Sequence, residues 1–271
     1  MRGRDAEQGL VRHLLERARR GKGGVLLVEG EPGAGKTSLL AAAGEAAGAD
    51  GLVVAASAAN ELASFSPLSG LSVGLPAGPA LRRPRASPVA GVPVRGLQGQ
   101  LEELASAGPA LVTLDDVHWA DPATLHALRS LPGLLAGYPL AWILARGTHG
   151  GDPEAGTLFD VLEHTGGARA ELAPLTGEAQ TAVMRDLLGG TPDEDLADSA
   201  ACAAGNPLML TEFLRGLVDE GAVSIAAGRA RLLSRKVPER FRAVIGNRLA
   251  TLAGRTKYLL EAGSVLGRSF R

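Results

Sequence analysis

The order of apolar runs and turn-forming residues along the first 175 positions predicts an α/β fold. Residues 7–20 place apolar side chains at helical spacing, and residues 25–28 form a short continuous apolar run. Such a run is typical of a strand that is buried on both faces. A glycine-rich turn and a helix-forming segment at residues 38–47 follow. Strand, turn and helix in this order begin a parallel α/β sheet.

Four further apolar runs predict the other strands of this sheet, at residues 52–56, 110–114, 140–145 and 169–172. Helical patterns connect the later strands, at residues 97–107, from residue 122 onward and at residues 158–164. Asp121 is the expected N-cap of the middle helix, since it directly precedes a proline at the first helical position.

Residues 66–96 interrupt this regular alternation. They hold six of the 16 prolines and a basic cluster at Arg82, Arg83 and Arg85. Proline and glycine at this density predict a long surface insertion rather than a further element. The basic cluster has no aromatic partners, so a solvated loop is a better interpretation of it than a nucleic-acid contact.

After residue 175 the pattern becomes mainly helical. Helices are expected at residues 178–188, 193–204, 207–220, 239–252 and 255–266, and a β-hairpin at residues 222–225 and 230–233 around Gly228. This change predicts a domain boundary after residue 175. The last apolar helix has no following element to pack against, so we expect a fragment that stops inside a further domain.

Composition narrows the range of functions. The 271 residues carry a formal net charge of −1, which leaves no basic surface to drive DNA binding by this chain alone. Cys202 is the only cysteine, which excludes an intrachain disulfide, and its Ala-rich surroundings predict a buried position. The N-terminus lacks the apolar core of a signal peptide, and no apolar run reaches the roughly 18 residues of a membrane span. We expect a cytoplasmic protein without a membrane partner.

Residues 30–37, Gly-Glu-Pro-Gly-Ala-Gly-Lys-Thr, match the P-loop pattern G-x-x-x-x-G-K-[ST] without exception. Glycines let backbone N–H groups turn inward around a phosphate at a helix N-terminus. Lys36 would supply a positive charge to the β- and γ-phosphates, and the Thr37 hydroxyl would bind Mg²⁺. The pattern predicts a binding site for a purine nucleoside triphosphate, with ATP as the first candidate, or for its product ADP. The predicted contact residues are Gly30, Glu31, Pro32, Gly33, Ala34, Gly35, Lys36, Thr37 and Ser38.

The strand at residues 110–114 ends in two carboxylates, Asp115 and Asp116, which is the Walker B pattern. A carboxylate at a strand end can hold Mg²⁺, and its neighbour can orient or deprotonate the attacking water. We assign Asp115 to magnesium and Asp116 to water activation. Together with Lys36, Asp116 is thus a catalytic candidate.

Arg146 follows the fourth predicted strand and is the third catalytic candidate. Its guanidinium would face the γ-phosphate if this strand lies between the strands that carry the P-loop and Asp115. An ordinary surface arginine at the start of a loop explains the residue equally well. The five histidines show no metal-ligand spacing, so ordinary surface or core roles are expected for them.

Four motifs occur in order along the chain: Gly-Arg-Asp-Ala-Glu from Gly3, the P-loop, Leu-Asp-Asp-Val-His-Trp-Ala-Asp at residues 114–121, and Gly-Asn-Pro-Leu at residues 205–208. Together they resemble the signal-transduction ATPases with numerous domains (STAND), which are close to AAA+ proteins. The sequence of residues 114–121 is most similar to the corresponding motif of large LuxR-type transcriptional regulators of actinobacteria. The resemblance covers nearly the whole chain.

The resemblance implies a P-loop NTPase sheet with the strand order 5-1-4-3-2. It implies that Arg4 and Pro207 flank the adenine base. In these terms residues 1–175 are the nucleotide-binding domain, residues 176–221 a helical lid, and residues 222–271 the beginning of a winged-helix domain. In the family, a sensor region and a C-terminal DNA-binding region follow, and we expect both to lie outside these 271 residues.

The predicted function is an ATP-binding regulatory switch of a LuxR-type transcriptional regulator that hydrolyses ATP slowly. A self-standing P-loop enzyme, such as a small-molecule kinase or another ATPase, is the alternative. A scaffold that binds nucleotide without hydrolysis is a third interpretation, which Asp116 disfavours. The oligomeric state stays open, a nucleotide-dependent homo-oligomer included.

Overall fold

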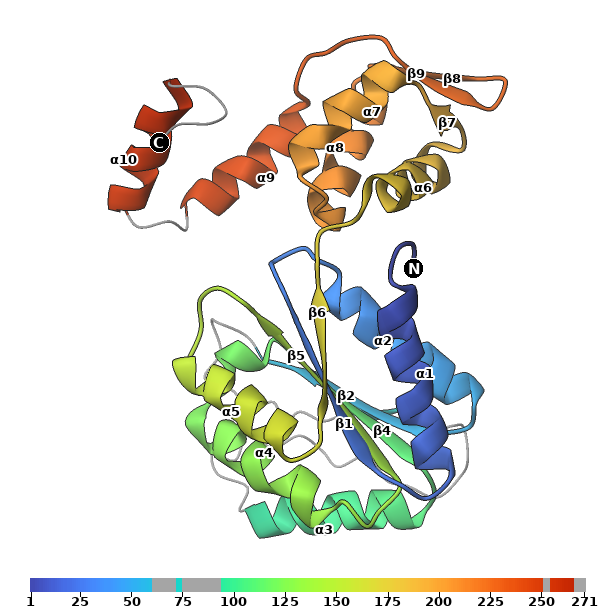
Figure 1. Ribbon diagram of the computed structural model, residues 1–271, viewed down its shortest axis with the longest axis vertical. Helices are drawn as coiled ribbons and strands as arrows, with labels where there is room; N and C mark the ends of the chain where they lie inside the picture. Colours follow the sequence, from blue (N-terminus) through green and yellow to red (C-terminus); the bar gives the residue numbers. More distant parts are fainter. Residues whose placement is uncertain (60–71, 75–93, 251–253, 266–271) are drawn as a thin grey trace. The chain divides into compact units, whose positions relative to one another are not determined.

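The computed structural model describes residues 1–59, 72–74, 94–250 and 254–265. The basic cluster at Arg82, Arg83 and Arg85, and most of the predicted insertion, lie outside these residues. The chain divides into two compact units (Figure 1). The first is Gly3–Ala173 with Met1, and the second is Pro174–Arg271 with Arg2. Each unit is described by itself below.

The first unit is built on the parallel sheet that the sequence predicts. Its strands follow the order β3-β2-β4-β5-β1-β6. All pairs from β2 to β6 are parallel, so the predicted order 5-1-4-3-2 is confirmed. The parallel strands are β1 (Gly24–Gly30), β2 (Val53–Ala58), β4 (Ala110–Asp115), β5 (Leu140–Gly147) and β6 (Ala168–Leu172).

One strand of this sheet was not predicted. β3 (Ser72–Gly74) lies inside the proline-rich insertion and pairs antiparallel with β2. Three residues are too few to produce an alternating pattern in a sequence, which explains why the strand was missed.

Two layers of helices cover the sheet, and the alternation of side chains along the strands separates them. Leu26, Val28 and Ile143 pack with residues of α1 (Asp5–Arg19) and α2 (Lys36–Ala49). Their neighbours Leu27 and Trp142 belong to a second core with α3 (Val94–Ser106), α4 (Pro122–Leu134) and α5 (Pro153–His164). Figure 1 shows α4 and α5 on the side of the sheet opposite to α1. Successive residues at a strand end therefore face different helix layers.

Helix starts follow the expected capping chemistry. The Asp121 carboxylate accepts a hydrogen bond from the Thr124 N–H at 3.0 Å, directly before Pro122, which confirms the predicted N-cap. Asp152 caps α5 in the same way, by accepting from the N–H of Glu154 at 2.8 Å. Both caps fix where the chain turns back over the sheet after β4 and β5.

The second unit has a small core of its own. The helices α6 (Gly177–Leu188), α7 (Glu194–Ala200), α8 (Pro207–Asp219) and α9 (Glu239–Ala250) surround it. Met184, Leu196, Phe213 and Phe241 are among its buried side chains. The predicted hairpin is formed by β8 (Val223–Ala226) and β9 (Arg229–Leu232), and β7 (Thr191–Pro192) adds a parallel strand to it. A division into a lid (176–221) and a winged-helix start (222–271) stays a prediction, since these residues form one unit.

One expectation in this unit is wrong. Cys202 is exposed, not buried, because the predicted helix over residues 193–204 ends early. A short 3₁₀ turn, Ala201–Ala203, follows α7 and buries Ala203 instead.

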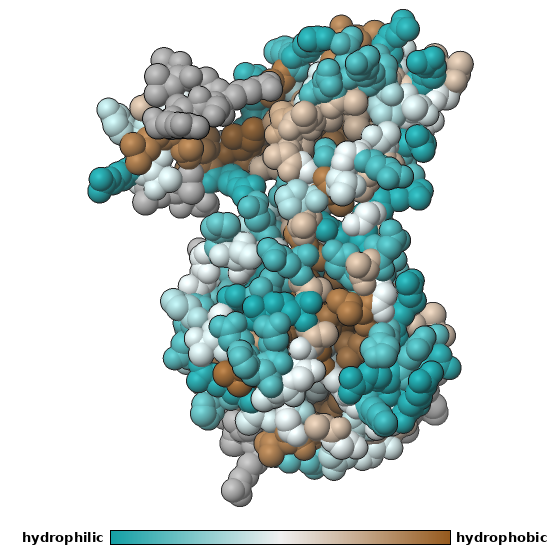
Figure 2. Space-filling model, in the orientation of Figure 1, coloured by the Kyte–Doolittle hydropathy of each residue, from teal (hydrophilic) through white to brown (hydrophobic). Residues whose placement is uncertain are grey.

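The last helix, α10 (Gly254–Val265), presents hydrophobic side chains to solvent. Tyr258, Leu259 and Leu260 expose 70%, 59% and 45% of their surface. Figure 2 shows hydrophobic residues at the surface in the α9 and α10 region. No helix in the described part of the chain is long and apolar enough to cross a bilayer.

The packing of α4 gives a direct test of the fold. Leu128 is fully buried, whereas Leu134 on the same helix is 57% exposed. Leu128→Ala is expected to lower the free energy of unfolding by about 2–5 kcal/mol, because it removes buried methyl groups and leaves a cavity. The matched change Leu134→Ala should cost less than about 1 kcal/mol. Urea denaturation of the two variants checks this, and equal losses would contradict the described core.

Candidate nucleotide-binding site

The P-loop connects the end of β1 to the start of α2. Gly30 is the last residue of β1, and α2 begins at Lys36. Gly33 and Gly35 have φ angles of 83° and 101°, a region that disfavours residues with a side chain. Gly35 is the N-cap of α2 and offers no side-chain cap. The N–H groups of the first turn therefore remain available, and the positive end of the helix dipole favours an anion there.

Gly30 is required for a different reason, which is close packing. A Cβ atom at this position would lie 3.0 Å from the Cβ of Leu172 on β6 and 3.1 Å from the Cβ of Ala34. The start of the P-loop is thus pressed against the neighbouring strand.

Lys36 is buried at the base of the loop. Its Nζ donates hydrogen bonds to the carbonyl oxygens of Gly30 at 3.0 Å and Glu31 at 3.1 Å. Burial lowers the pKa of Lys36, while the charges of Asp116 and Asp115 act in the opposite direction. The Lys36 side chain therefore links the helix end of the loop to its start, and its ammonium group lies in the field of both carboxylates.

The residues assigned to magnesium meet in the structure. The Thr37 hydroxyl donates a hydrogen bond of 2.6 Å to the Asp115 carboxylate, although 78 positions separate them in sequence. Alternation along β4 places Asp115 on the α2 face of the sheet, where α2 carries Thr37. Mg²⁺ prefers hard oxygen ligands, commonly one or two from the protein, with phosphate oxygens and water completing its shell. A hydroxyl and a carboxylate in contact fit this ion.

Asp116 lies at a sharp turn beside this pair. Its φ angle is 50°, an uncommon value for a residue other than glycine, and its N–H donates to the Asp115 carboxylate at 2.9 Å. Burial and then the charge of Asp115 raise the pKa of Asp116, and Lys36 opposes this shift. A raised pKa brings a carboxylate closer to the range in which it can take a proton at neutral pH.

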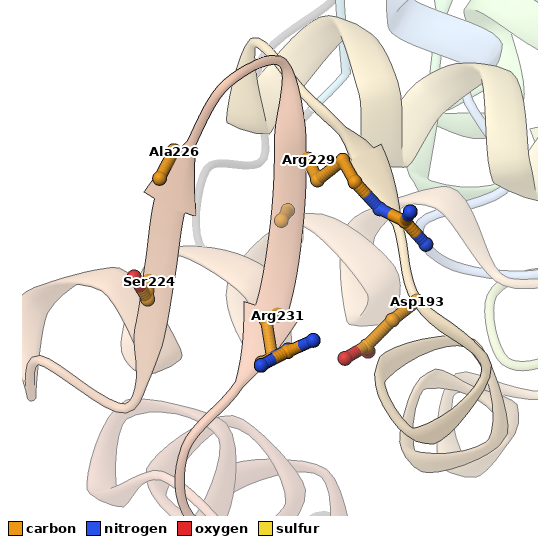
Figure 3. Close-up of a pocket in the computed structure, with 6 residues that line it drawn as sticks. Asp193, Ser224, Ala226, Arg229 and Arg231 are labelled. Atoms are coloured by element: carbon orange, nitrogen blue, oxygen red, sulfur yellow. The ribbon is translucent and has the colours of Figure 1, made fainter.

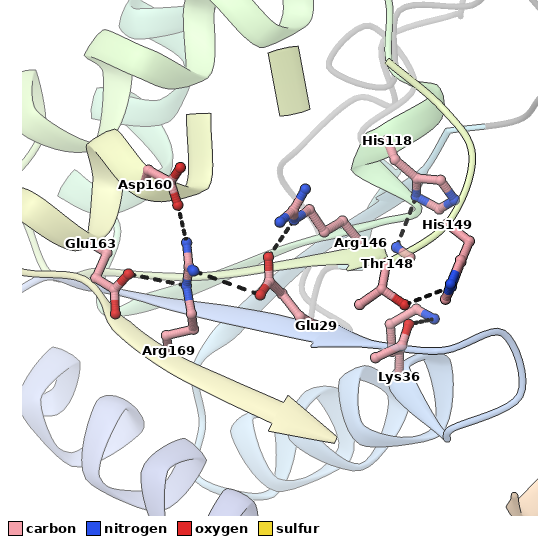
Figure 4. Close-up of polar contacts among 11 residues, drawn as sticks. Glu29, Lys36, His118, Arg146, Thr148, His149, Asp160, Glu163 and Arg169 are labelled. Atoms are coloured by element: carbon pink, nitrogen blue, oxygen red, sulfur yellow. Dashed lines mark hydrogen bonds and ion pairs between the residues drawn. The ribbon is translucent and has the colours of Figure 1, made fainter. Parts of the chain in front are cut away.

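Arg146 occupies the predicted strand, since β5 lies between β4 and β1. Its side chain, however, pairs with the Glu29 carboxylate (Figure 4). Its guanidinium lies 5.0 Å from the Phe159 ring centre on α5. Alternation explains this position, because Arg146 shares the face of Trp142, opposite to Asp115. Contact with a γ-phosphate stays a prediction that requires the Glu29 pair to open.

Glu29 is the centre of a larger charged network that sequence reasoning missed. This carboxylate is 8% exposed and also lies 3.8 Å from the guanidinium of Arg169 on β6. Arg169 in turn contacts Asp160 at 2.8 Å and Glu163 at 3.2 Å on α5 (Figure 4). A glutamate directly before a P-loop, in register with Arg146 on β5 and two positions from the register partner of Arg169 on β6, is the signal that could have revealed it.

The two residues that the resemblance places beside adenine have different surroundings. Arg4 is 4% exposed, and its guanidinium donates to the Ala34 carbonyl of the P-loop at 3.1 Å and contacts Glu7 at 3.4 Å. It thus braces the phosphate loop directly. Pro207 begins α8 in the second unit, after the Asn206 N-cap. A contact of either residue with adenine stays a prediction.

A hollow in the second unit offers a different kind of surface. Its volume is ≈ 250 Å³, and Arg229, Arg231, Ser224 and Asp193 contribute its polar side chains (Figure 3). Asp193 already caps α7, accepting from the Leu196 N–H at 2.9 Å. The hollow contains no paired catalytic groups comparable with those at the P-loop.

The sequence of the first unit matches a known family. The model of the AAA ATPase domain covers residues 1–143, more than half of the 271 positions. The chain belongs to the AAA ATPase domain family. The match includes the P-loop and both carboxylates, and it ends within β5 before Arg146. A search of curated proteins found no match.

Solved structures of similar fold come from several organisms. The Aeropyrum pernix ORC2 protein in ADPNP–ADP complexes has a TM-score of 0.59 and 17% identity, over 95% of this chain and 71% of that chain. AMPPCP-bound DnaA from Aquifex aeolicus has a TM-score of 0.55 and 18% identity, over 81% and 62%. Cdc6p from Pyrobaculum aerophilum has a TM-score of 0.53 and 16% identity, over 80% and 62%. At these identities the likeness shows a shared fold.

The Glu29 network predicts a site-specific stability loss in the AAA ATPase domain. Glu29→Gln removes the negative charge that two arginines share and should destabilise the first unit by about 1.5–3 kcal/mol, the usual worth of a hydrogen bond to a charged group. Glu171 is the register partner of Glu29 on β6 and is exposed, so Glu171→Gln is the matched control. Chemical denaturation of both variants measures the difference, and equal stabilities would contradict the described pairing.

Proposed function

We propose that this AAA ATPase domain binds ATP with Mg²⁺ and hydrolyses it slowly, as the regulatory switch of a LuxR-type STAND transcriptional regulator. The observation that carries the nucleotide part is the contact between Thr37 and Asp115 beside the buried Lys36. Three residue types that a P-loop enzyme needs around its phosphates converge there from α2 and β4. The regulatory part of the proposal is supported by the sequence motifs at residues 114–121 and 205–208.

In this proposal the protein positions the phosphates and supports one proton transfer. Backbone N–H groups of the P-loop and Lys36 hold the β- and γ-phosphates. Thr37 and Asp115 hold Mg²⁺, which when bound neutralises charge on the phosphate oxygens. A water oxygen forms a bond to the γ-phosphorus, the bond to the bridging oxygen of ADP breaks, and Asp116 takes the proton released by the water.

The switch has a candidate element in the Glu29 network. A γ-phosphate would compete with Glu29 for the guanidinium of Arg146, because both are anions that a guanidinium binds well. Bound ATP would then draw Arg146 from α5 toward the phosphate, and hydrolysis would return it. This links the nucleotide state to the packing of α5, whose Phe159 contacts Arg146.

The alternative function, a small-molecule kinase, has a separate test. Added phosphate acceptors would increase turnover if the chain were a kinase instead.

The first test concerns binding. A ligand at a hundred times its Kd stabilises a protein by about 2.7 kcal/mol, which corresponds to a melting shift of about 5–10 °C for a chain of this size. Wild-type protein and Lys22→Ala, which changes an exposed lysine, should both show this shift with ATP and Mg²⁺. Lys36→Ala should abolish it. A folded, nucleotide-free wild type without any shift at millimolar ATP would refute the proposal.

The second test separates the two carboxylates. Asp116→Asn should keep nucleotide affinity and lose hydrolysis, because an amide fills the same space but takes no proton. Asp115→Asn should weaken binding in the presence of Mg²⁺ and leave binding in EDTA nearly unchanged. Kd by equilibrium titration and turnover per bound nucleotide are the two readouts. Equal loss of affinity in both variants, with unchanged turnover per bound nucleotide, would show that the division of roles is wrong.

A further inference from the structure

His118 connects the two strand ends that carry the candidate catalytic residues. It lies in a 3₁₀ turn, Val117–Trp119, directly after Asp115 and Asp116. Its Nδ1 accepts a hydrogen bond of 3.1 Å from the N–H of Gly147, at the end of β5 (Figure 4). Since a backbone N–H can only donate, Nδ1 carries no proton in this contact, and the neutral ring holds its proton on Nε2.

The chain after β5 is fitted closely around this histidine. A Cβ atom at Gly147 would lie 2.9 Å from the His118 Nε2, and one at Gly151 would lie 2.3 Å from the His118 carbonyl oxygen. That carbonyl accepts a hydrogen bond of 2.8 Å from the N–H of Asp152. His118 is 7% exposed. Both the ring and the backbone of His118 are thus held by one loop.

This contact fixes the surroundings of Asp116. The Asp116 carboxylate lies 4.0 Å from the His118 Nδ1, and the Asp116 carbonyl accepts from the Trp119 N–H at 2.8 Å. The positive φ of Asp116 is a strained conformation, which persists only where neighbouring contacts enforce it. His118 supplies the contact to β5, immediately next to Arg146.

We propose that His118 is a positioning residue for hydrolysis. It ties the Asp116 turn to the loop that follows Arg146, so that the proton-accepting carboxylate and the arginine strand keep one geometry. His118 acts through Asp116 and touches no reacting atom. The inference rests on the proposed function, since it assumes that Asp116 takes a proton from water.

Two substitutions separate this role from simple packing. His118→Leu puts an apolar side chain of similar size at this position and removes the Nδ1 acceptor. His118→Asn restores an acceptor oxygen close to the position of Nδ1. Both variants should bind ATP and Mg²⁺ like the wild type. Single-turnover hydrolysis should fall about 100-fold in His118→Leu, the order expected for a displacement near 1 Å, and should recover to within about tenfold of wild type in His118→Asn.

A pH titration gives a second readout. The Trp119 ring centre lies 5.1 Å from that of His118, and a protonated imidazole quenches indole fluorescence. Burial lowers the pKa of His118, as do Lys36 and Arg146, while Asp115 opposes them. Asp116 also faces the ring. Trp119 emission and turnover should therefore fall together below about pH 6.5, and the emission change should be missing in His118→Asn.

Gly147→Ala tests the same contact from the other strand and serves if His118→Leu does not fold. Its methyl group would displace the His118 ring, so turnover should fall while affinity stays. Unchanged turnover in folded His118→Leu or Gly147→Ala would overturn the inference, as would equal losses of affinity and turnover in both His118 variants. A wild type that binds ATP without hydrolysing it would refute the hydrolytic part of the proposed function, and the His118 role with it. If the wild type hydrolyses ATP and His118→Leu hydrolyses it at the same rate, only the role of His118 is refuted.

Discussion

The contact between the Thr37 hydroxyl and the Asp115 carboxylate is the interaction on which the site depends. It joins the first turn of α2 to the end of β4 at 2.6 Å. A parallel sheet makes this contact available, because β1 and β4 flank β5 and end at the same edge. Such edges, at the carboxyl ends of strands, are where open α/β sheets bind their ligands.

This arrangement brings the charges of two carboxylates and one lysine close together. Asp115 is buried directly beside Asp116, and its charge adds to burial in raising the pKa of Asp116. Lys36 offsets part of this repulsion, and a divalent cation beside Thr37 would offset more. The carboxylate pair and the P-loop are therefore electrostatically complementary, and a phosphate-bound cation would complete the proposed site.

On the opposite face of the sheet, Glu29 holds two arginines that lie at the ends of neighbouring strands. Its position directly before the P-loop connects the loop to Arg146 and, through Arg169, to α5. The His118 contact with Gly147 reaches the same strand from the Asp116 side. The strand β5, which lies between β4 and β1, is thus connected to both halves of the site.

Local patterns predicted the five parallel strands of the first unit, the P-loop and the Asp121 cap, since each depends on neighbours in sequence. The strand order came from the resemblance. Arg146 shares one face of β5 with Trp142 and Leu144. The alternation of side chains along this strand could therefore have predicted that Arg146 lies on the α5 side of the sheet.

Contacts between distant segments had no comparable signal. The acceptor role of His118 depends on Gly147, which lies 29 positions away, and the pairing of Glu29 depends on the sheet register. Gly147 and Gly151 leave room for His118, but no local pattern connects these glycines with a histidine so far upstream.

Calorimetric titration of nucleotide-free protein with ATP is the most direct test of a magnesium-dependent nucleotide site at the P-loop. We expect one site per chain with Mg²⁺ present, much weaker binding in EDTA, and no binding heat for Lys36→Ala. Absence of binding by folded wild-type protein, or binding that Lys36→Ala leaves unchanged, would contradict it.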